Sequence, residues 1–199
     1  QTVWLEPVPQ TYVRGLKVLT DRKQGTVTVK ADAVGASKNS QLKVTVKAEG
    51  KVVASQEQSA DQEIVIKLEN VHLWSPADPY LYDLDIELID NDKTIDSVAS
   101  YFGVRSIELG KDHNGLTRIF FNGEPLFQYG PLDQGYWPDG LYTAPTDEAL
   151  KYDLDVTKQL GFNMVRKHVK VEPARWYYWC DKLGLIVWQD MPSGATNAP

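Results

Sequence analysis

The hydrophobic period changes once along this chain of 199 residues, and this change limits the folds that it can adopt. Up to about Leu109, apolar residues recur at every second position, which is typical of strands with one buried face. The clearest of these segments are residues 26–31, 42–47, 64–68 and 84–88. Turn signals separate them and no helical pattern intervenes. Residues 1–109 therefore predict seven or eight short strands and an immunoglobulin-like β-sandwich.

From residue 110 onward, helical and strand patterns alternate. Thr146 is placed to cap a helix that ends at Gly161, and a second helix is expected from Ala174 to Leu183. Residues 162–169 and 185–190 have the composition of strands. The resulting order β-α-β-α-β predicts a parallel sheet. A complete (β/α)₈ TIM barrel needs about 250 residues, so residues 110–199 are expected to form its first three strands and two helices.

Composition excludes several classes of function. The net charge is −6, from 21 basic and 27 acidic residues, and neither half is basic, so no nucleic-acid partner is expected. The longest apolar runs, such as residues 185–188, are too short to span a membrane. Cys180 is the single cysteine, which excludes an internal disulfide and a cysteine-based metal cage. The three histidines show no metal-ligand spacing, so neither a metal nor a cofactor is predicted.

Aromatic residues are unevenly distributed. Only 5 of the 21 Phe, Trp and Tyr residues lie in residues 1–100, and 16 lie in residues 101–199. An enrichment of this size suits a ligand cleft as well as a core. It also supports a change of architecture near the middle of the chain.

Four groups of short motifs resemble family 2 glycoside hydrolases, which include β-galactosidases, β-glucuronidases and β-mannosidases. Residues 1–7 resemble the closing strand of the family's jelly-roll domain, and residues 73–82 resemble the end of its immunoglobulin-like domain. Residues 101–105 and 121–125 resemble the entry into its catalytic barrel. Residues 161–168 and 181–188 resemble its signature around barrel strands two and three. The motifs occur in the family's order and cover nearly the whole chain.

The resemblance implies a retaining glycosidase mechanism with two glutamates about 5–5.5 Å apart. In the family the acid/base stands in an Asn-Glu pair after barrel strand four, and the nucleophile stands on strand seven. No Asn-Glu pair occurs in this sequence. We therefore expect a piece of a larger enzyme that carries no catalytic residue of its own. A carbohydrate substrate and a periplasmic or extracellular location are implied by the family.

The resemblance and the strand ends together predict five substrate-binding residues. Arg166 and His168 fall at the end of the second barrel strand, where the family's Arg and His line the pocket. This chain has one residue between them instead of the family's two. In a strand, this difference changes the face to which a side chain points, so the sequence does not determine whether His168 faces the pocket. Asp190 ends the third strand and Asp133 follows the first. Trp137 lies in the loop after the first strand, where its ring can stack on a sugar.

Two further expectations concern partners. The alternative function is a non-catalytic carbohydrate-binding or structural sandwich module, which would not need the β-α-β-α-β half. The third barrel strand, residues 185–190, has no fourth strand beside it in this sequence. Its apolar edge is expected to favour self-association, which light scattering over a concentration series would detect.

Overall fold

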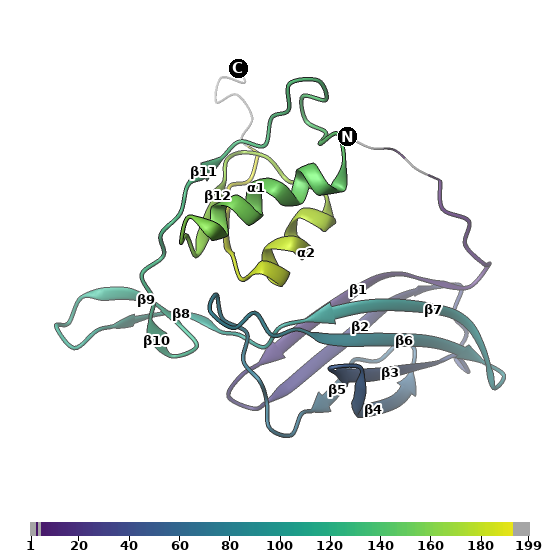
Figure 1. Cartoon of the computed structure of the whole chain (residues 1–199). Helices are drawn as coiled ribbons and strands as arrows, with labels where there is room; N and C mark the ends of the chain where they lie inside the picture. The colour runs from purple at the N-terminus through teal and green to yellow at the C-terminus, as the bar shows by residue number, and fades with distance from the viewer. Residues whose placement is uncertain (1–2, 4, 193–199) are drawn as a thin grey trace, which may run out of the picture. The chain divides into compact units, whose positions relative to one another are not determined.

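The computed structural model describes Val3 and residues 5–192, which form two compact units (Figure 1). The sandwich unit comprises Leu5–Trp74 and Tyr80–Pro125, and the helical unit comprises Ser75–Pro79 and residues 126–192. The units therefore divide after Pro125, whereas the predicted boundary between residues 109 and 110 falls inside a strand. Gln1, Thr2 and Trp4 of the first motif lie outside the described residues.

Seven strands of the sandwich unit form two antiparallel sheets with the orders β1-β2-β5 and β4-β3-β6-β7. The strands are β1 (Tyr12–Asp21), β2 (Thr26–Val34), β3 (Gln41–Ala48), β4 (Lys51–Ser59), β5 (Ile64–Lys67), β6 (Tyr82–Asp90) and β7 (Lys93–Phe102). The inner faces of both sheets contribute to one hydrophobic core. The four strands predicted from alternation are confirmed.

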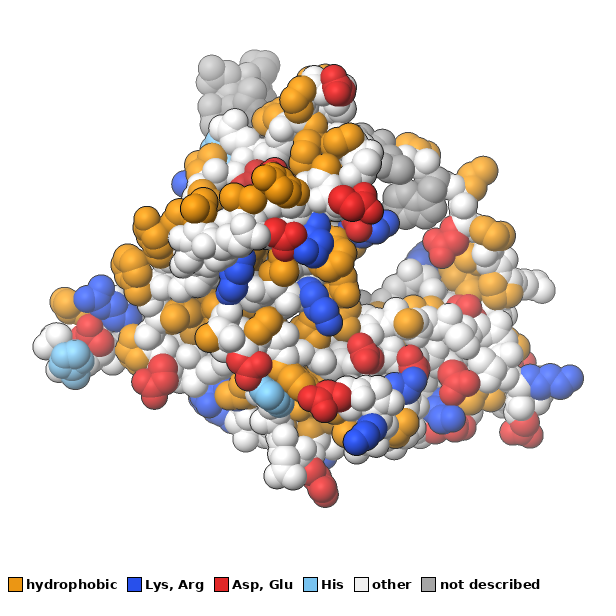
Figure 2. Space-filling view, in the orientation of Figure 1, with side chains coloured by type: hydrophobic (Ala, Val, Ile, Leu, Met, Phe, Trp, Pro, Cys, Tyr) orange, Lys and Arg blue, Asp and Glu red, His pale blue; other side chains and the backbone are white. Residues whose placement is uncertain are grey.

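The period-two pattern explains which side chains enter this core. In β3, Leu42 and Val44 are fully buried, whereas Lys43 between them lies on the outer face and pairs with Glu87 of β6 at 3.2 Å. A strand with this alternation can bury only one face. On the face of the sandwich unit drawn in Figure 2, acidic and basic side chains are interspersed, without a continuous basic patch.

The expected eighth strand forms, but it joins a separate sheet. β8 (Ile107–Lys111), β9 (Thr117–Phe121) and β10 (Glu124–Pro125) form a three-stranded antiparallel sheet. The turn between β9 and β10 has φ values of +53° at Asn122 and +89° at Gly123. The Asn-Gly pair tolerates this left-handed conformation, which a tight β-hairpin turn requires at both central residues.

Residues from three of the family-like motifs meet around one buried indole. Trp74 is 1% exposed, and the guanidinium of Arg105 lies 4.4 Å from its ring centroid. The backbone N–H of Trp74 donates to Val104 at 2.9 Å. The side chain of Asn122 donates to the Trp74 carbonyl and accepts from the Ser106 N–H, both at 2.9 Å. These motifs therefore form one structural junction inside the sandwich unit.

The helical unit contains the predicted β-α-β-α-β order. β11 (Leu132–Asp133), β12 (Met164–Lys167) and β13 (Ile186–Gln189) pair in parallel in this order, with α1 (Asp147–Gln159) and α2 (Ala174–Leu183) as the crossovers. Both predicted helices are confirmed. β11 and β13 are the edges of this sheet among the described residues, and self-association through β13 stays a prediction. No helix in the described part of the chain is long and apolar enough to cross a membrane.

Capping and burial explain where the two helices begin and end. The Thr146 hydroxyl accepts from the Ala149 N–H at 3.1 Å and caps α1. Gly184 ends α2 with φ +78°, a conformation that favours glycine. Leu150, Leu154, Trp176 and Cys180 on the helices pack with Val165 and Leu185 of the sheet region. This burial raises the pKa of the Cys180 thiol, as expected for an inert core cysteine.

Candidate functional site

The carboxyl ends of the three parallel strands bring the predicted residues to one edge of the sheet. Just beyond β12, the N–H of His168 donates to the carbonyl of Asp133 at 2.9 Å. The N–H of Asp190, just beyond β13, donates to the carbonyl of Lys167 at 3.0 Å. These bonds extend the strand pairing by one residue. Asp133, His168 and Asp190 therefore lie along the edge where ligands bind in parallel α/β sheets.

Arg166 and Asp190 form a bidentate ion pair on one face of this sheet. Because Val165 packs with the helices, the strand alternation places Arg166 on the opposite face. Its Nε donates to Oδ1 of Asp190 at 3.2 Å and its Nη2 donates to Oδ2 at 2.9 Å. This hydrogen bonding lowers the pKa of Asp190, and the charge of His168 contributes further. Three of the predicted residues, Arg166, His168 and Asp190, therefore interact through hydrogen bonds or charge.

We expect the Asp190 carboxyl to titrate below the ordinary aspartate value of about 3.9. Because the folded pKa is lowered, the ion pair stabilises the fold above the unfolded-state pKa, and this contribution is lost as the pH falls through the folded value. Carbon-13 NMR of the carboxyl carbon measures the midpoint directly. Arg166→Gln should move it upward; an unchanged midpoint in this variant would contradict the pairing.

Asp133 belongs to a second, buried group of charges. Lys167 follows Arg166 on β12 and points to the helix-bearing side, where it is only 1% exposed. Its Nζ donates to Asp133 at 2.5 Å and to Glu172 at 2.9 Å, and it lies 4.3 Å from the ring centroid of Trp176. A buried ammonium needs such partners, because leaving it uncompensated costs several kcal/mol. Asp133 is therefore held by a fully paired lysine.

Lys170 extends this group into the loop after β11. Its buried Nζ lies 2.9 Å from Glu172 and donates to the backbone carbonyls of Gly135 and, at 3.0 Å, Tyr142. Gly135 has φ +65°, and a Cβ there would lie 2.3 Å from the Glu172 carboxylate. Only glycine therefore fits where the loop crosses the charged group. Lys167, Lys170, Asp133 and Glu172 form what we call the buried ion network.

The loop between β11 and α1 contains a closed turn. Trp137 and Leu141 exchange backbone hydrogen bonds of 2.8 and 3.0 Å. Trp137 is half-buried, whereas its neighbour Tyr136 and the residue that follows the turn, Tyr142, are exposed. The hydroxyl groups of these two tyrosines lie 2.9 Å apart, and this hydrogen bond raises the pKa of Tyr136.

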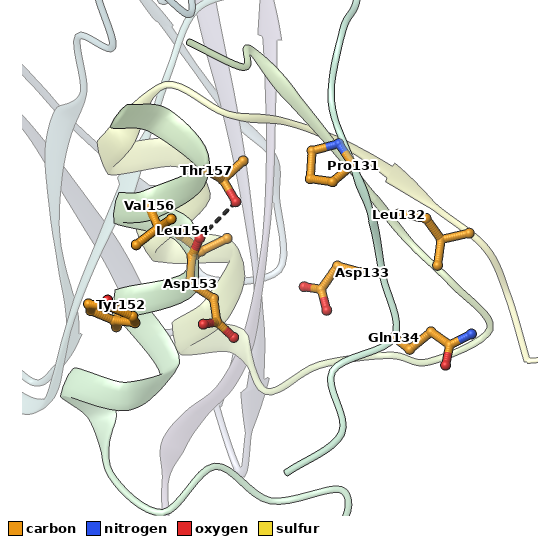
Figure 3. A pocket seen from close by; sticks show the side chains of 9 residues that line it. All are labelled: Pro131, Leu132, Asp133, Gln134, Tyr152, Asp153, Leu154, Val156 and Thr157. Carbon is orange, nitrogen blue, oxygen red and sulfur yellow. Dashed lines mark hydrogen bonds between the residues drawn. The ribbon is translucent and has the colours of Figure 1, made fainter. Parts of the chain in front are cut away.

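A cavity of about 350 Å³ lies on the helix-bearing side of β11 (Figure 3). Asp133 and Asp153 point into it from opposite walls, whereas Leu132 points the other way. Desolvation, followed by the charge of Asp133, raises the pKa of Asp153. The walls of the cavity are formed by residues of β11 and α1 and their neighbours: Pro131, Leu132, Asp133, Gln134, Tyr152, Asp153, Leu154, Val156 and Thr157. Because Arg166 lies on the opposite face of the sheet, this cavity is separate from the Arg166–Asp190 pair.

Sequence reasoning placed Asp133, His168 and Asp190 at one edge of the sheet and missed the other three members of the buried ion network. Lys167, Lys170 and Glu172 were not singled out, although Lys167 follows Val165 at the period of a strand and so shares its buried face. The alternation of the strand therefore indicated that Lys167 is buried. The described residues contain no group of three or more His, Cys, Asp or Glu side chains that could hold a metal ion.

The sequence of this chain is similar to those of known glycoside hydrolases. The family model described as glycosyl hydrolases family 2 matches residues 11–105. A putative β-glucuronidase from Formosa agariphila is 29% identical over 87% of this chain and 17% of its own length. A β-galactosidase from Thermoanaerobacter pseudethanolicus is 28% identical over 96% of this chain and 27% of its own length.

A solved structure shares the fold of this chain. The crystal structure of an FMN-binding β-glucuronidase from Facaelibacterium prausnitzii L2-6 matches with a TM-score of 0.80 and 25% identity, over 93% of this chain and 30% of that one. This chain thus spans less than a third of the length of these three relatives. The matches confirm the resemblance that the short motifs indicated.

Proposed function

We propose that this chain, which belongs to glycoside hydrolase family 2, is the sandwich domain and the start of the catalytic barrel of a retaining glycoside hydrolase. The observation that carries the proposal is the Arg166–Asp190 pair at the carboxyl edge of a parallel sheet, beside Asp133. Barrel enzymes build their active sites at this edge. The relatives are named for the hydrolysis of β-galactosides and β-glucuronides.

In this proposal Arg166, His168, Asp190 and Trp137 form part of the substrate pocket, and Asp133 supports the adjoining loop from the helix-bearing side. The planar guanidinium of Arg166 is held in place by Asp190 and presents its remaining donors to a carboxylate or a sugar hydroxyl. His168 supplies a polar group at the same edge, and Trp137 lies in the adjoining loop. Their task is to orient the sugar, since positioning lowers the barrier to reaction.

The two catalytic glutamates of the retaining mechanism would come from later barrel strands. One protonates the leaving oxygen and the other forms the glycosyl-enzyme, at a separation of about 5–5.5 Å. The absence of an Asn-Glu pair from this sequence supports their location outside it.

We expect the isolated 199-residue chain to hydrolyse none of the aryl β-galactoside, β-glucuronide and β-mannoside substrates. Without an acid/base and a nucleophile, both the proton-transfer and the covalent contributions to catalysis are lost. The longer gene product that contains this chain should hydrolyse at least one of the three. An inactive longer product would overturn the proposed function. Activity of the short chain that disappears in Asp133→Asn or Asp190→Asn would refute the location of the glutamates.

A further inference from the structure

Two exposed tyrosines form a preformed pair in the loop after β11. Tyr136 is 57% exposed and Tyr142 is 49% exposed, yet their ring centroids lie 5.0 Å apart and their hydroxyl groups are hydrogen-bonded. The mutual backbone bonds of Trp137 and Leu141 close the turn between them. The rings thus keep a defined arrangement without being part of the core.

Lys170 holds both ends of this turn. Its ammonium binds the carbonyl of Gly135, directly before Tyr136, and the carbonyl of Tyr142 itself. The same ammonium is only 5.5 Å from the ring centroid of Tyr142. Glu172 neutralises it from the buried side. A loop held in this way has lost its conformational freedom before a ligand arrives, which is the basis of preorganised binding.

The loop that carries the tyrosine pair begins at the carboxyl end of β11. Asp133 accepts a hydrogen bond of 2.7 Å from the Gly135 N–H through one oxygen and binds Lys167 through the other. The loop therefore leaves the carboxyl end of β11 in a direction that the buried ion network determines. Ligands bind at this end of parallel strands.

We propose that Tyr136 and Tyr142 form a stacking platform for a sugar ring of the substrate, and that Lys170 is the residue that positions it. Tyrosine combines an apolar ring, which suits the C–H face of a pyranose, with a hydroxyl that exchanges hydrogen bonds with sugar hydroxyls. The occupant follows from the proposed function, on which this inference rests.

NMR of the tyrosine rings in the 199-residue chain tests the platform, with methyl β-D-galactopyranoside and methyl β-D-glucuronide as probes. We expect saturable shifts of the Tyr136 and Tyr142 resonances with at least one probe. Tyr136→Ala should weaken binding about 5-fold, in line with the strength of aromatic contacts, whereas Tyr136→Phe should retain most of the affinity. Tyr129→Ala is the matched control, because Tyr129 is a 57% exposed tyrosine of the same unit that precedes β11 and does not line the cavity.

Lys170→Met tests the positioning role. Well below its melting temperature, this variant should bind the probe about 5-fold more weakly, because an unrestrained loop must be ordered on binding. Its amides in residues 135–142 should exchange at least tenfold faster than in the wild type, while those of α1 remain unchanged. A merely structural lysine would lower the melting temperature and leave the affinity of the folded chain intact, and that result would overturn the positioning role. Tyr136→Ala keeps the platform testable if Lys170→Met does not fold.

The outcomes separate this inference from the proposed function. Shifts confined to the neighbourhood of Arg166 and Asp190 would overturn the platform and leave the proposed function standing. The absence of any saturable shift would also overturn the platform. The proposed function itself is decided by hydrolysis in the longer gene product, which does not depend on the tyrosine resonances.

Discussion

Glu172→Ala is expected to lower the free energy of unfolding of the helical unit by about 3–5 kcal/mol, the usual cost of breaking a buried ion pair. Glu172 accepts from both Lys167 and Lys170 at 2.9 Å, and all three side chains are almost completely buried. Without the carboxylate, two neighbouring ammonium groups would repel each other, and Lys170 would lose its charged partner. Amide hydrogen exchange of α1 and β12 in the full chain measures the loss.

Two variants make this result specific. Glu172→Gln keeps the size of the side chain and removes its charge, so it should fall between the wild type and Glu172→Ala. Glu148→Gln is the matched control, since Glu148 is the exposed glutamate of the same unit and surface changes cost about 0.5 kcal/mol or less. A loss below about 1 kcal/mol in Glu172→Ala would mean that water already compensates these charges in solution.

Trp74→Ala should destabilise the sandwich unit by about 3–5 kcal/mol, as is usual for truncating a buried aromatic residue. The indole is fully buried, lies against Phe121 at a centroid distance of 5.8 Å and carries the Arg105 guanidinium on its face. A Cβ at Gly103 would lie 3.0 Å from the Trp74 side chain, so the surrounding backbone is already close. The cavity left by alanine has little room to collapse.

Hydrogen exchange of the β3 and β6 amides measures this second effect in the full chain. Trp74→Phe should lose less, because it keeps an aromatic ring beneath Arg105. Val53→Ala is the control, since Val53 is an exposed residue of the same unit. A Trp74→Ala variant as stable as Val53→Ala would show that the junction of the family-like motifs contributes nothing to stability.

The sequence by itself determined the elements and their order. The alternation around Val44 and the helical period between Thr146 and Gly161 each allow one face to be buried, so strands and helices could be predicted with their approximate ends. The carboxyl ends of parallel strands meet at one edge, so Asp133, Arg166 and Asp190 could be expected to lie together. Local periodicity was sufficient for the elements, whereas the choice of residues at the strand ends also used the resemblance to family 2 glycoside hydrolases.

Tertiary structure alone decided how the charges are paired. Arg166 and Lys167 are adjacent basic residues, yet one pairs with Asp190 on one face of the sheet and the other is buried between Asp133 and Glu172. Tyr136 and Tyr142 meet only because the turn between them closes and Lys170 holds its two ends. Such contacts depend on strand register and on partners as far as 35 residues away along the chain, which no local period records.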